Sequence, residues 1–176
     1  MPSDDVGRHN RLAMARLFLE RARAQAARGQ LHKALRSVEE SLHQELGHPA
    51  ALALRREIRL LEQREKRRRQ APRNAQAHLE VGFSYLQLRR TDEAIFALDR
   101  ARALFPDLYL AQLLGVALHS RGRAAEARLA YERAAQPRAG DEMAHSLLAA
   151  LNHGEPPPYL AEEYSHAKHP SLSLSA

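Results

Sequence analysis

Apolar residues recur every three or four positions along most of the chain, which is the period of one face of an α-helix. These stripes predict helices over residues 10–28, 32–45, 50–69 and 75–88, a helix capped by Thr91, a hairpin over 107–136 that turns at Gly122, and a last helix over 142–151 capped by Asp141. No run alternates apolar and polar residues as a half-buried strand does. The pattern therefore predicts an all-α fold.

A spaced set of small and aromatic residues occurs three times along the predicted helices. The clearest copy comprises Gly82, Tyr85, Ala94, Leu98, Ala101 and Pro106. The next copy comprises Gly115, Leu118, Ala127, Tyr131 and Ala134, and an earlier, looser copy comprises Ala22, Gln25, Gly29, Ala34, Val38 and Ser41. An offset of one helical hairpin is typical of a repeat array. Because antiparallel helices approach closely only where side chains are small, we expect Gly82 and Ala94 to be buried at a helix crossing.

This pattern resembles the tetratricopeptide repeat (TPR). Residues 75–108 match it almost throughout, residues 108–140 match it with an early proline at Pro137, and residues 15–48 match it loosely. The resemblance implies a right-handed superhelical array of antiparallel helix hairpins, a TPR-like solenoid. It also implies that the first helix of each hairpin lines a concave groove that binds a partner protein, and that the array carries no chemistry of its own.

The predicted helices and the repeat divide the chain into six segments. These are a disordered N-terminus over 1–9, a degenerate TPR-like hairpin over 10–48, a basic helix and linker over 49–71, two TPR-like repeats over 72–140, a capping helix over 141–153 and a flexible tail over 154–176. The extra basic helix interrupts even stacking of the hairpins. We therefore expect the N-terminal hairpin and the basic helix to form a partly separate unit, or to self-associate with a second protomer.

The resemblance assigns particular residues to the groove. They are Gln76, Leu79, Phe83, Leu86 and Gln87 in one repeat and Tyr109, Gln112, Val116 and His119 in the next. The lysine and asparagine clamp that some family members use for a C-terminal carboxylate is missing. The surface is mostly apolar with amide edges, which suits a partner helix or extended peptide with apolar anchors, chiefly against Phe83 and Tyr109. The alternative is that the chain's own tail or last helix covers some of these residues.

A second candidate site is the basic window over residues 55–73, which holds nine basic and three acidic residues and so accounts for the whole net charge of +6. Its basic residues are Arg55, Arg56, Arg59, Arg64, Lys66, Arg67, Arg68, Arg69 and Arg73. Such a patch is suited to nucleic acid, an anionic surface or an acidic protein. The alternative is a solvated helix end, stabilised by pairs such as Glu65–Arg69. Because no apolar residue occurs from Glu62 to Gln70, we expect that segment to be exposed and not packed in the core.

The composition excludes several kinds of site. The sequence contains no cysteine, so it has no disulfide, thiolate metal site or cysteine nucleophile. No apolar run is long enough to span a membrane. Residues 1–5 are polar and lack the apolar core of a secretory signal, which favours a cytoplasmic, bacterial setting.

Two histidine-containing segments invite a metal-site interpretation. His43 and His48 are spaced too widely for the zinc-protease pair on one helical face. Glu162, His166 and His169 would share a face only in a helix, which the neighbouring prolines disfavour. No catalytic set can be assembled elsewhere, so we expect no enzyme activity, metal or cofactor.

The sequence therefore predicts a non-enzymatic scaffold or adaptor that binds another protein. One alternative is nucleic-acid or anionic-surface binding through residues 55–73. Another is a regulatory fragment related to a TPR-containing methyltransferase. It rests on a weaker resemblance, in which residues 145–151, residues 154–157 and Tyr159 are similar to the junction where a repeat array leads into a methyltransferase domain in bacterial proteins. No activity is inferred from that junction.

Overall fold

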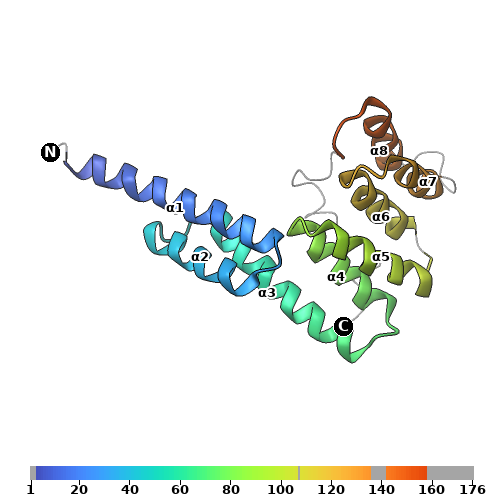
Figure 1. The fold of residues 1–176 in the computed structure, drawn as a ribbon, viewed down its shortest axis with the longest axis horizontal. Helices are drawn as coiled ribbons and strands as arrows, with labels where there is room; N and C mark the ends of the chain where they lie inside the picture. The colour runs from blue at the N-terminus through green and yellow to red at the C-terminus, as the bar shows by residue number, and fades with distance from the viewer. Residues whose placement is uncertain (1–2, 107, 136–141, 158–176) are drawn as a thin grey trace. The chain divides into compact units, whose positions relative to one another are not determined.

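The computed structural model of the chain describes residues 3–106, 108–135 and 142–157, and within these ranges it contains eight helices and no strand (Figure 1). The helices are α1 (Ser3–Ala27), α2 (Leu31–Gln44), α3 (Pro49–Gln70), α4 (Ala75–Gln87), α5 (Thr91–Leu104), α6 (Leu108–Ser120), α7 (Ala124–Ala135) and α8 (Glu142–His153). The all-α prediction is confirmed for the described residues. The chain divides into two compact units, residues 1–105 (unit 1) and residues 106–176 (unit 2), which are described separately here.

Three pairs of consecutive helices pack as hairpins, α1 with α2, α4 with α5, and α6 with α7. Their turns share one backbone geometry, in which Gly29, Arg89 and Gly122 have positive φ angles of 74°, 57° and 73°. The amide of the following residue then donates to a carbonyl in the last turn of the first helix, at 2.8–2.9 Å in all three turns. This is a common way to satisfy the last carbonyls of a helix. The same helix cap at all three turns indicates that the three hairpins share one local structure.

The predicted close crossing is present in both of the clearer hairpins. In α4, a methyl group added at Gly82 would lie 2.7 Å from Cγ of Leu98 in α5. In α6, a methyl group at Gly115 would lie 2.5 Å from Cε1 of Tyr131 in α7. Gly82 and Ala94 are both buried, which confirms the expectation for them. Only glycine leaves room for the facing side chain at these two positions.

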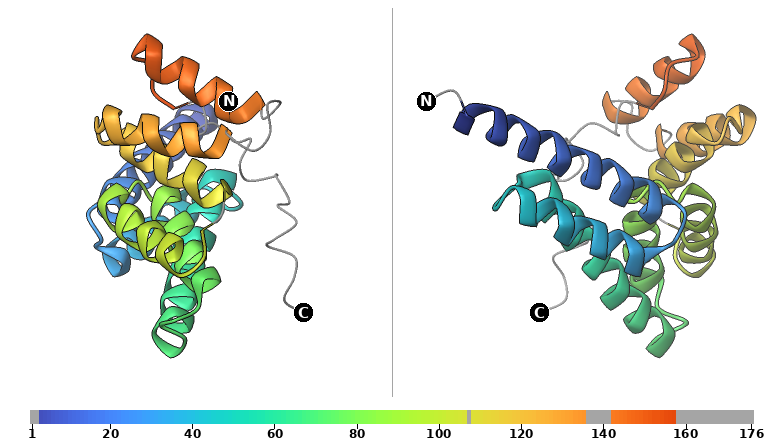
Figure 2. Two further views of the ribbon diagram at one scale, coloured as in Figure 1. Left: turned by 90° about the vertical axis from the view of Figure 1, so that its right-hand side faces the viewer. Right: turned by 60° about the vertical axis from the view of Figure 1, so that its left-hand side comes forward.

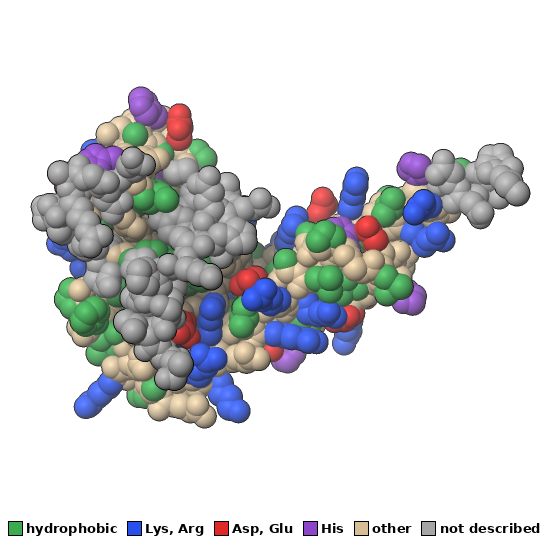
Figure 3. All heavy atoms as spheres, turned by 180° about the vertical axis from the view of Figure 1, so that it is seen from behind, with side chains coloured by type: hydrophobic (Ala, Val, Ile, Leu, Met, Phe, Trp, Pro, Cys, Tyr) green, Lys and Arg blue, Asp and Glu red, His purple; other side chains and the backbone are tan. Residues whose placement is uncertain are grey.

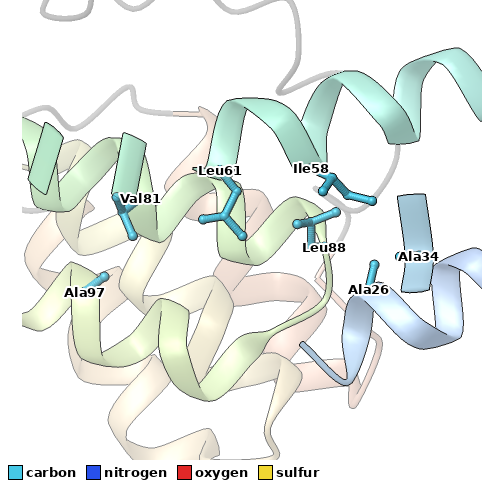
Figure 4. Packing of buried hydrophobic residues seen from close by; sticks show 7 residues of the cluster. All are labelled: Ala26, Ala34, Ile58, Leu61, Val81, Leu88 and Ala97. Carbon is cyan, nitrogen blue, oxygen red and sulfur yellow. The ribbon is translucent and has the colours of Figure 1, made fainter. Parts of the chain in front are cut away.

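Unit 1 contains a core that joins its helices across two hairpins. One cluster of buried residues draws on α1, α2, α3, α4 and α5, and comprises Ala26, Ala34, Ile58, Leu61, Val81, Leu88 and Ala97. Figure 4 shows Ile58 and Leu61 pointing from α3 toward Leu88. Residues 1–105 thus form one compact unit, in which the N-terminal hairpin and α3 are not separated from the second hairpin, and self-association with a second protomer stays a prediction. The apolar stripe of α3 packs between the two hairpins, so both share its buried surface.

A second cluster holds the N-terminal hairpin against the start of α3. Its buried members are Leu19 and Ala22 of α1, Val38 and Leu42 of α2, and Ala51 of α3. The helices α1 and α2 run antiparallel, side by side, in Figure 1 and in the right view of Figure 2. The small residues on their facing sides allow this close approach.

In unit 2, α8 packs on the hairpin formed by α6 and α7. The contact is made by the buried alanines Ala111, Ala134 and Ala144, one from each helix. Leu147 of α8 is also fully buried. The helix thus covers apolar surface of the hairpin, as its stripe of small and apolar residues predicts.

Two helix starts differ from the sequence prediction. We expected disorder over residues 1–9, whereas α1 begins at Ser3. The prediction followed the apolar stripe, but a helix backbone can continue beyond its packed face, and Val6 is largely exposed. We also expected Thr91 to cap α5, but the cap position is Arg90 and no side-chain cap bond forms there. Asp141, the predicted cap of α8, lies outside the described residues.

Candidate functional site

The groove residues predicted in α4 divide into exposed and buried groups. Gln87 is exposed, whereas Gln76 and Phe83 are half-buried. Leu79 and Leu86 are buried within the chain. Phe83 is therefore the large apolar side chain of this group that keeps free surface.

The groove residues predicted in α6 are mostly buried. Tyr109 is 8% exposed, and Gln112 and Val116 are also buried. The half-buried ring of His119 meets the edge of Tyr131, with ring centroids 6.2 Å apart. Burial lowers the pKa of His119 below its ordinary value, although a hydrogen bond with the backbone of Glu155 opposes this. Near neutral pH this imidazole is thus an uncharged packing group.

The basic helix end is mostly exposed, as predicted, but Arg64, Glu65 and Arg68 are half-buried. Arg64 reaches from α3 to α4 and donates to Oγ of Ser84 at 2.6 Å. Glu65 accepts from the hydroxyl of Tyr85 at 2.5 Å, also across the α3–α4 contact. Polar side chains thus continue the packing after the apolar stripe ends at Leu61. Six of the nine residues from Glu62 to Gln70 are exposed and none is buried, so the prediction that the segment stays outside the core is confirmed. The polar contacts of Arg64 and Glu65 were missed because the prediction counted apolar residues alone.

The nine basic residues of the window do not form one continuous patch. Arg55 pairs with Glu39 of α2 at 3.2 Å, and Arg67 pairs with Glu80 of α4 at 3.5 Å. Figure 3 shows Lys and Arg side chains interspersed with Asp and Glu along the N-terminal helices on the face it displays. Five of the nine make no ion pair with another described residue, namely Arg56, Arg59, Arg64, Lys66 and Arg73, although Arg64 donates to Ser84.

Glu65 is the centre of a small polar network between α3 and α4. Besides the Tyr85 hydroxyl, it accepts from Arg68 at 2.8 Å and lies 3.9 Å from Arg69. Burial alone would raise the pKa of Glu65, but the hydrogen bonds from Tyr85 and Arg68 and the two arginine charges outweigh it and lower the pKa. Burial and the same hydrogen bond raise the pKa of Tyr85 to about 12. At neutral pH the carboxylate is therefore charged and the phenol keeps its proton.

Arg90 completes the network from the turn between α4 and α5. Its guanidinium lies over the ring of Tyr85, 4.8 Å from the centroid, and donates to Glu93 through Nε at 3.0 Å. A cation over an aromatic face is attracted by the ring. The turn also brings this guanidinium close to Gly29. A methyl group added at Gly29 would lie 3.1 Å from a terminal nitrogen of Arg90. Arg90 thus ties the α4–α5 turn to the α1–α2 turn.

Two neighbouring pockets in unit 1 share this network as a wall. The first has a volume of about 600 Å³, and its lining is Leu31, Leu61, Glu62, Glu65, Lys66, Arg68, Arg69, Gln70, Tyr85 and Arg90. The second has a volume of about 280 Å³, and its lining is Glu65, Arg68, Val81, Tyr85, Asp92, Glu93, Phe96 and Ala97. Glu65, Arg68 and Tyr85 belong to both. The first pocket is rich in cations and the second contains exposed apolar surface, because Phe96 is 63% exposed.

The sequence did not identify this double pocket. The repeat pattern places Tyr85 at a helix-packing position and indicates no role for Arg90 or Phe96. The pocket depends on which turn of α3 faces which turn of α4, since Glu65 and Tyr85 are twenty residues apart. Helical periodicity fixes the face of each helix but not this register, so no signal in the sequence reveals it.

Replacing Tyr85 by phenylalanine should lower the free energy of unfolding by about 1–3 kcal/mol at neutral pH, because it removes a hydrogen bond to a charged group. The raised pKa of Tyr85 means that the folded wild type holds this proton more tightly than the unfolded chain. The difference in unfolding free energy between the wild type and the variant should therefore shrink as the pH rises from the ordinary tyrosine pKa of 10.0 to the folded-state pKa of about 12. Urea unfolding of both proteins across this range measures it. A constant difference would contradict the Tyr85–Glu65 bond.

Comparisons with known proteins give little further information. No protein-family model matches the sequence, and no curated protein matches it. Among solved structures, the chain is similar to MamA AMB-1, with 18% sequence identity, a TM-score of 0.45, and coverage of 92% of this chain and 97% of that chain. At this identity and TM-score the likeness carries no argument about function.

The described residues hold neither a membrane-spanning helix nor a cluster of metal ligands. No described helix is both long and apolar enough to cross a membrane. Within the same ranges, no three His, Asp or Glu side chains are grouped so that they could hold a metal ion. Glu162, His166 and His169 lie outside the described residues.

Proposed function

We propose that this chain is a non-enzymatic protein-interaction scaffold, a TPR-like array that binds a helix or extended peptide of a partner protein. The observation that carries this proposal is the repeated helix crossing. Gly82 faces Leu98 in one hairpin, and Gly115 faces Tyr131 in the next. The two glycines are thirty-three residues apart in the sequence, and so are Leu98 and Tyr131. Repeated hairpins of this kind build extended surfaces for binding rather than catalytic centres.

In unit 1 the contacts with the partner are proposed at the groove positions of α4, with Phe83 as the main anchor. Phe83 keeps free surface, and Gln76 and Gln87 lie seven residues before and four residues after it, on the same side of the helix. An aromatic anchor flanked by hydrogen-bonding groups suits a peptide that inserts an apolar side chain. Tyr109 stays a predicted contact, but its burial makes it a poor position for mutation, because truncation would disturb packing.

Nucleic-acid binding through residues 55–73 is less well supported. Arg55, Arg64 and Arg67 are engaged by Glu39, Ser84 and Glu80. Neutralising many phosphates requires many available cations. The ion pairs reduce that number and place acidic groups among the remaining cations.

Selection of peptides from a random display library on the immobilised chain tests the scaffold function. Enriched peptides should carry spaced apolar residues, and Phe83→Ala should weaken their binding by about tenfold. Phe105→Ala is the matched control, since Phe105 is an exposed aromatic outside the predicted groove. Circular dichroism confirms that both variants stay helical. Failure to enrich any peptide, or equal losses in the two variants, would overturn the groove.

A further inference from the structure

Unit 1 holds a second candidate binding site that is separate from the predicted groove. It is the double pocket between α3, α4 and α5, where the cationic and apolar pockets meet at Glu65, Arg68 and Tyr85. Cavities of a few hundred Å³ with convergent polar groups are the usual size and make-up of ligand sites. We propose that this double pocket binds a short acidic segment of a partner protein, with a carboxylate at Lys66 and Arg69 and a neighbouring apolar side chain against Val81 and Phe96.

The charge of the larger pocket favours an anionic group. Four cations line it, Lys66, Arg68, Arg69 and Arg90, against two acids, Glu62 and Glu65. Arg68 pairs with Glu65 and Arg90 pairs with Glu93, which leaves Lys66 and Arg69 against the single carboxylate of Glu62. The pocket therefore keeps an excess of positive charge after its internal pairs are formed.

Lys66 and Arg69 are the cations that an incoming carboxylate can reach most easily. They lie three residues apart on α3, which places them on one face of the helix. Lys66 makes no ion pair with another described residue, and the side chain of Arg69 is 78% exposed at 3.9 Å from Glu65. Arg68 adds donors behind them, because its Nε is buried and has no acceptor among the described residues. A carboxylate at this position would gain charge-assisted hydrogen bonds at little cost to the existing network.

The smaller pocket supplies the apolar half of the site. Phe96 is largely exposed beside buried Val81 and Ala97, and the ring of Tyr85 forms the wall between the two pockets. An exposed aromatic next to a small apolar depression is typical of a position where a partner inserts a side chain. The adjacent halves thus fit a segment with one acidic and one apolar residue close together.

A protein segment fits this site better than a nucleic acid does. Glu62 lies at the cationic pocket, and Asp92 and Glu93 line the apolar one. A continuous phosphate backbone would meet these carboxylates, whereas a peptide can place its single carboxylate on the cations and its apolar side chain beside Phe96. The site has its own residues, so it does not depend on groove binding by Phe83.

Fluorescence anisotropy with a short labelled peptide of glutamates and leucines tests the proposal on the full chain. The double variant Lys66→Gln/Arg69→Gln should weaken binding about tenfold. The matched control Arg56→Gln/Arg59→Gln removes the same charge from exposed positions of α3 outside the pockets, and should change affinity less than about twofold. Phe96→Ala should weaken binding as well, and Phe83→Ala should not, which separates this site from the groove.

Three results would overturn the proposal. The first is the absence of binding by the wild-type chain up to millimolar peptide. The second is an equal loss of affinity in Lys66→Gln/Arg69→Gln and in Arg56→Gln/Arg59→Gln, which would show attraction to net charge alone. The third is tighter binding of an oligothymidylate, or equal binding of the analogue in which glutamine replaces every glutamate. If the proposal is right, the glutamine analogue should bind about tenfold more weakly than the glutamate peptide.

Discussion

Truncating Tyr131 to alanine should destabilise unit 2 by about 3–5 kcal/mol, the range found when a large aromatic is removed from a core. Tyr131 is fully buried, and its ring lies against the backbone of α6 at Gly115. The cavity cannot close easily, because the helices are held apart by the other contacts of the hairpin. Urea unfolding gives the free energy, and hydrogen exchange in α6 and α7 assigns the loss to unit 2.

The partner of this change tests the crossing itself. Gly115→Ala should destabilise the wild type by about 1–3 kcal/mol, because the added methyl group overlaps the ring of Tyr131. In the Tyr131→Ala background the overlap with the ring is gone and only Cβ of Ala130, at 3.3 Å, stays close. The same change should then cost much less, or be neutral, since alanine is the better helix former. Gly7→Ala is the control, because nothing lies within 4 Å of a methyl group at Gly7. Additive effects at Gly115 and Tyr131 would contradict the close crossing.

The helix crossings could be predicted from the sequence because they depend on residue size at fixed spacing. Gly82 and Ala94 were expected at a crossing from this spacing alone, and both are buried. The information is local to one hairpin, whose two helices are joined by a short turn. A short turn leaves few ways to pair two helices, so the small residues can be matched across it.

The end of α3 could not be predicted by the same reasoning. Its contacts with α4 are polar, and an apolar stripe says nothing about Arg64 reaching Ser84 or Glu65 reaching Tyr85. Each of these side chains is also plausible on an exposed helix, where charged residues are common. Only the register between the two helices turns Glu65 into the centre of a network.

The predicted groove shows a second limit of helical periodicity. The spacing of Leu79, Phe83 and Leu86 places them near one face of α4, but it does not say what covers that face. In the structure Leu79 and Leu86 are buried, whereas Phe83 keeps some exposed surface. Burial depends on which neighbouring elements pack against the helix, and one helix's pattern does not contain this information.

The place of α3 in unit 1 leads to the last prediction. Ile58→Ala should destabilise unit 1 by about 2–5 kcal/mol. Ile58 is fully buried, in a cluster that joins Ala26 and Ala34 of the first hairpin to Val81 and Leu88 of the second. Because both hairpins share this surface, α1–α2 and α4–α5 should lose hydrogen-exchange protection together.

The matched control for this change is Leu52→Ala, on the same helix. Leu52 is 37% exposed, so its truncation leaves a smaller cavity and should cost less than Ile58→Ala. If Ile58→Ala lowered protection in α1–α2 while α4–α5 kept theirs, the first hairpin would unfold independently, as the sequence alone suggested. Joint loss would show that the apolar stripe of α3, which ends at Leu61, stabilises two hairpins that are separated in the sequence by the whole basic helix.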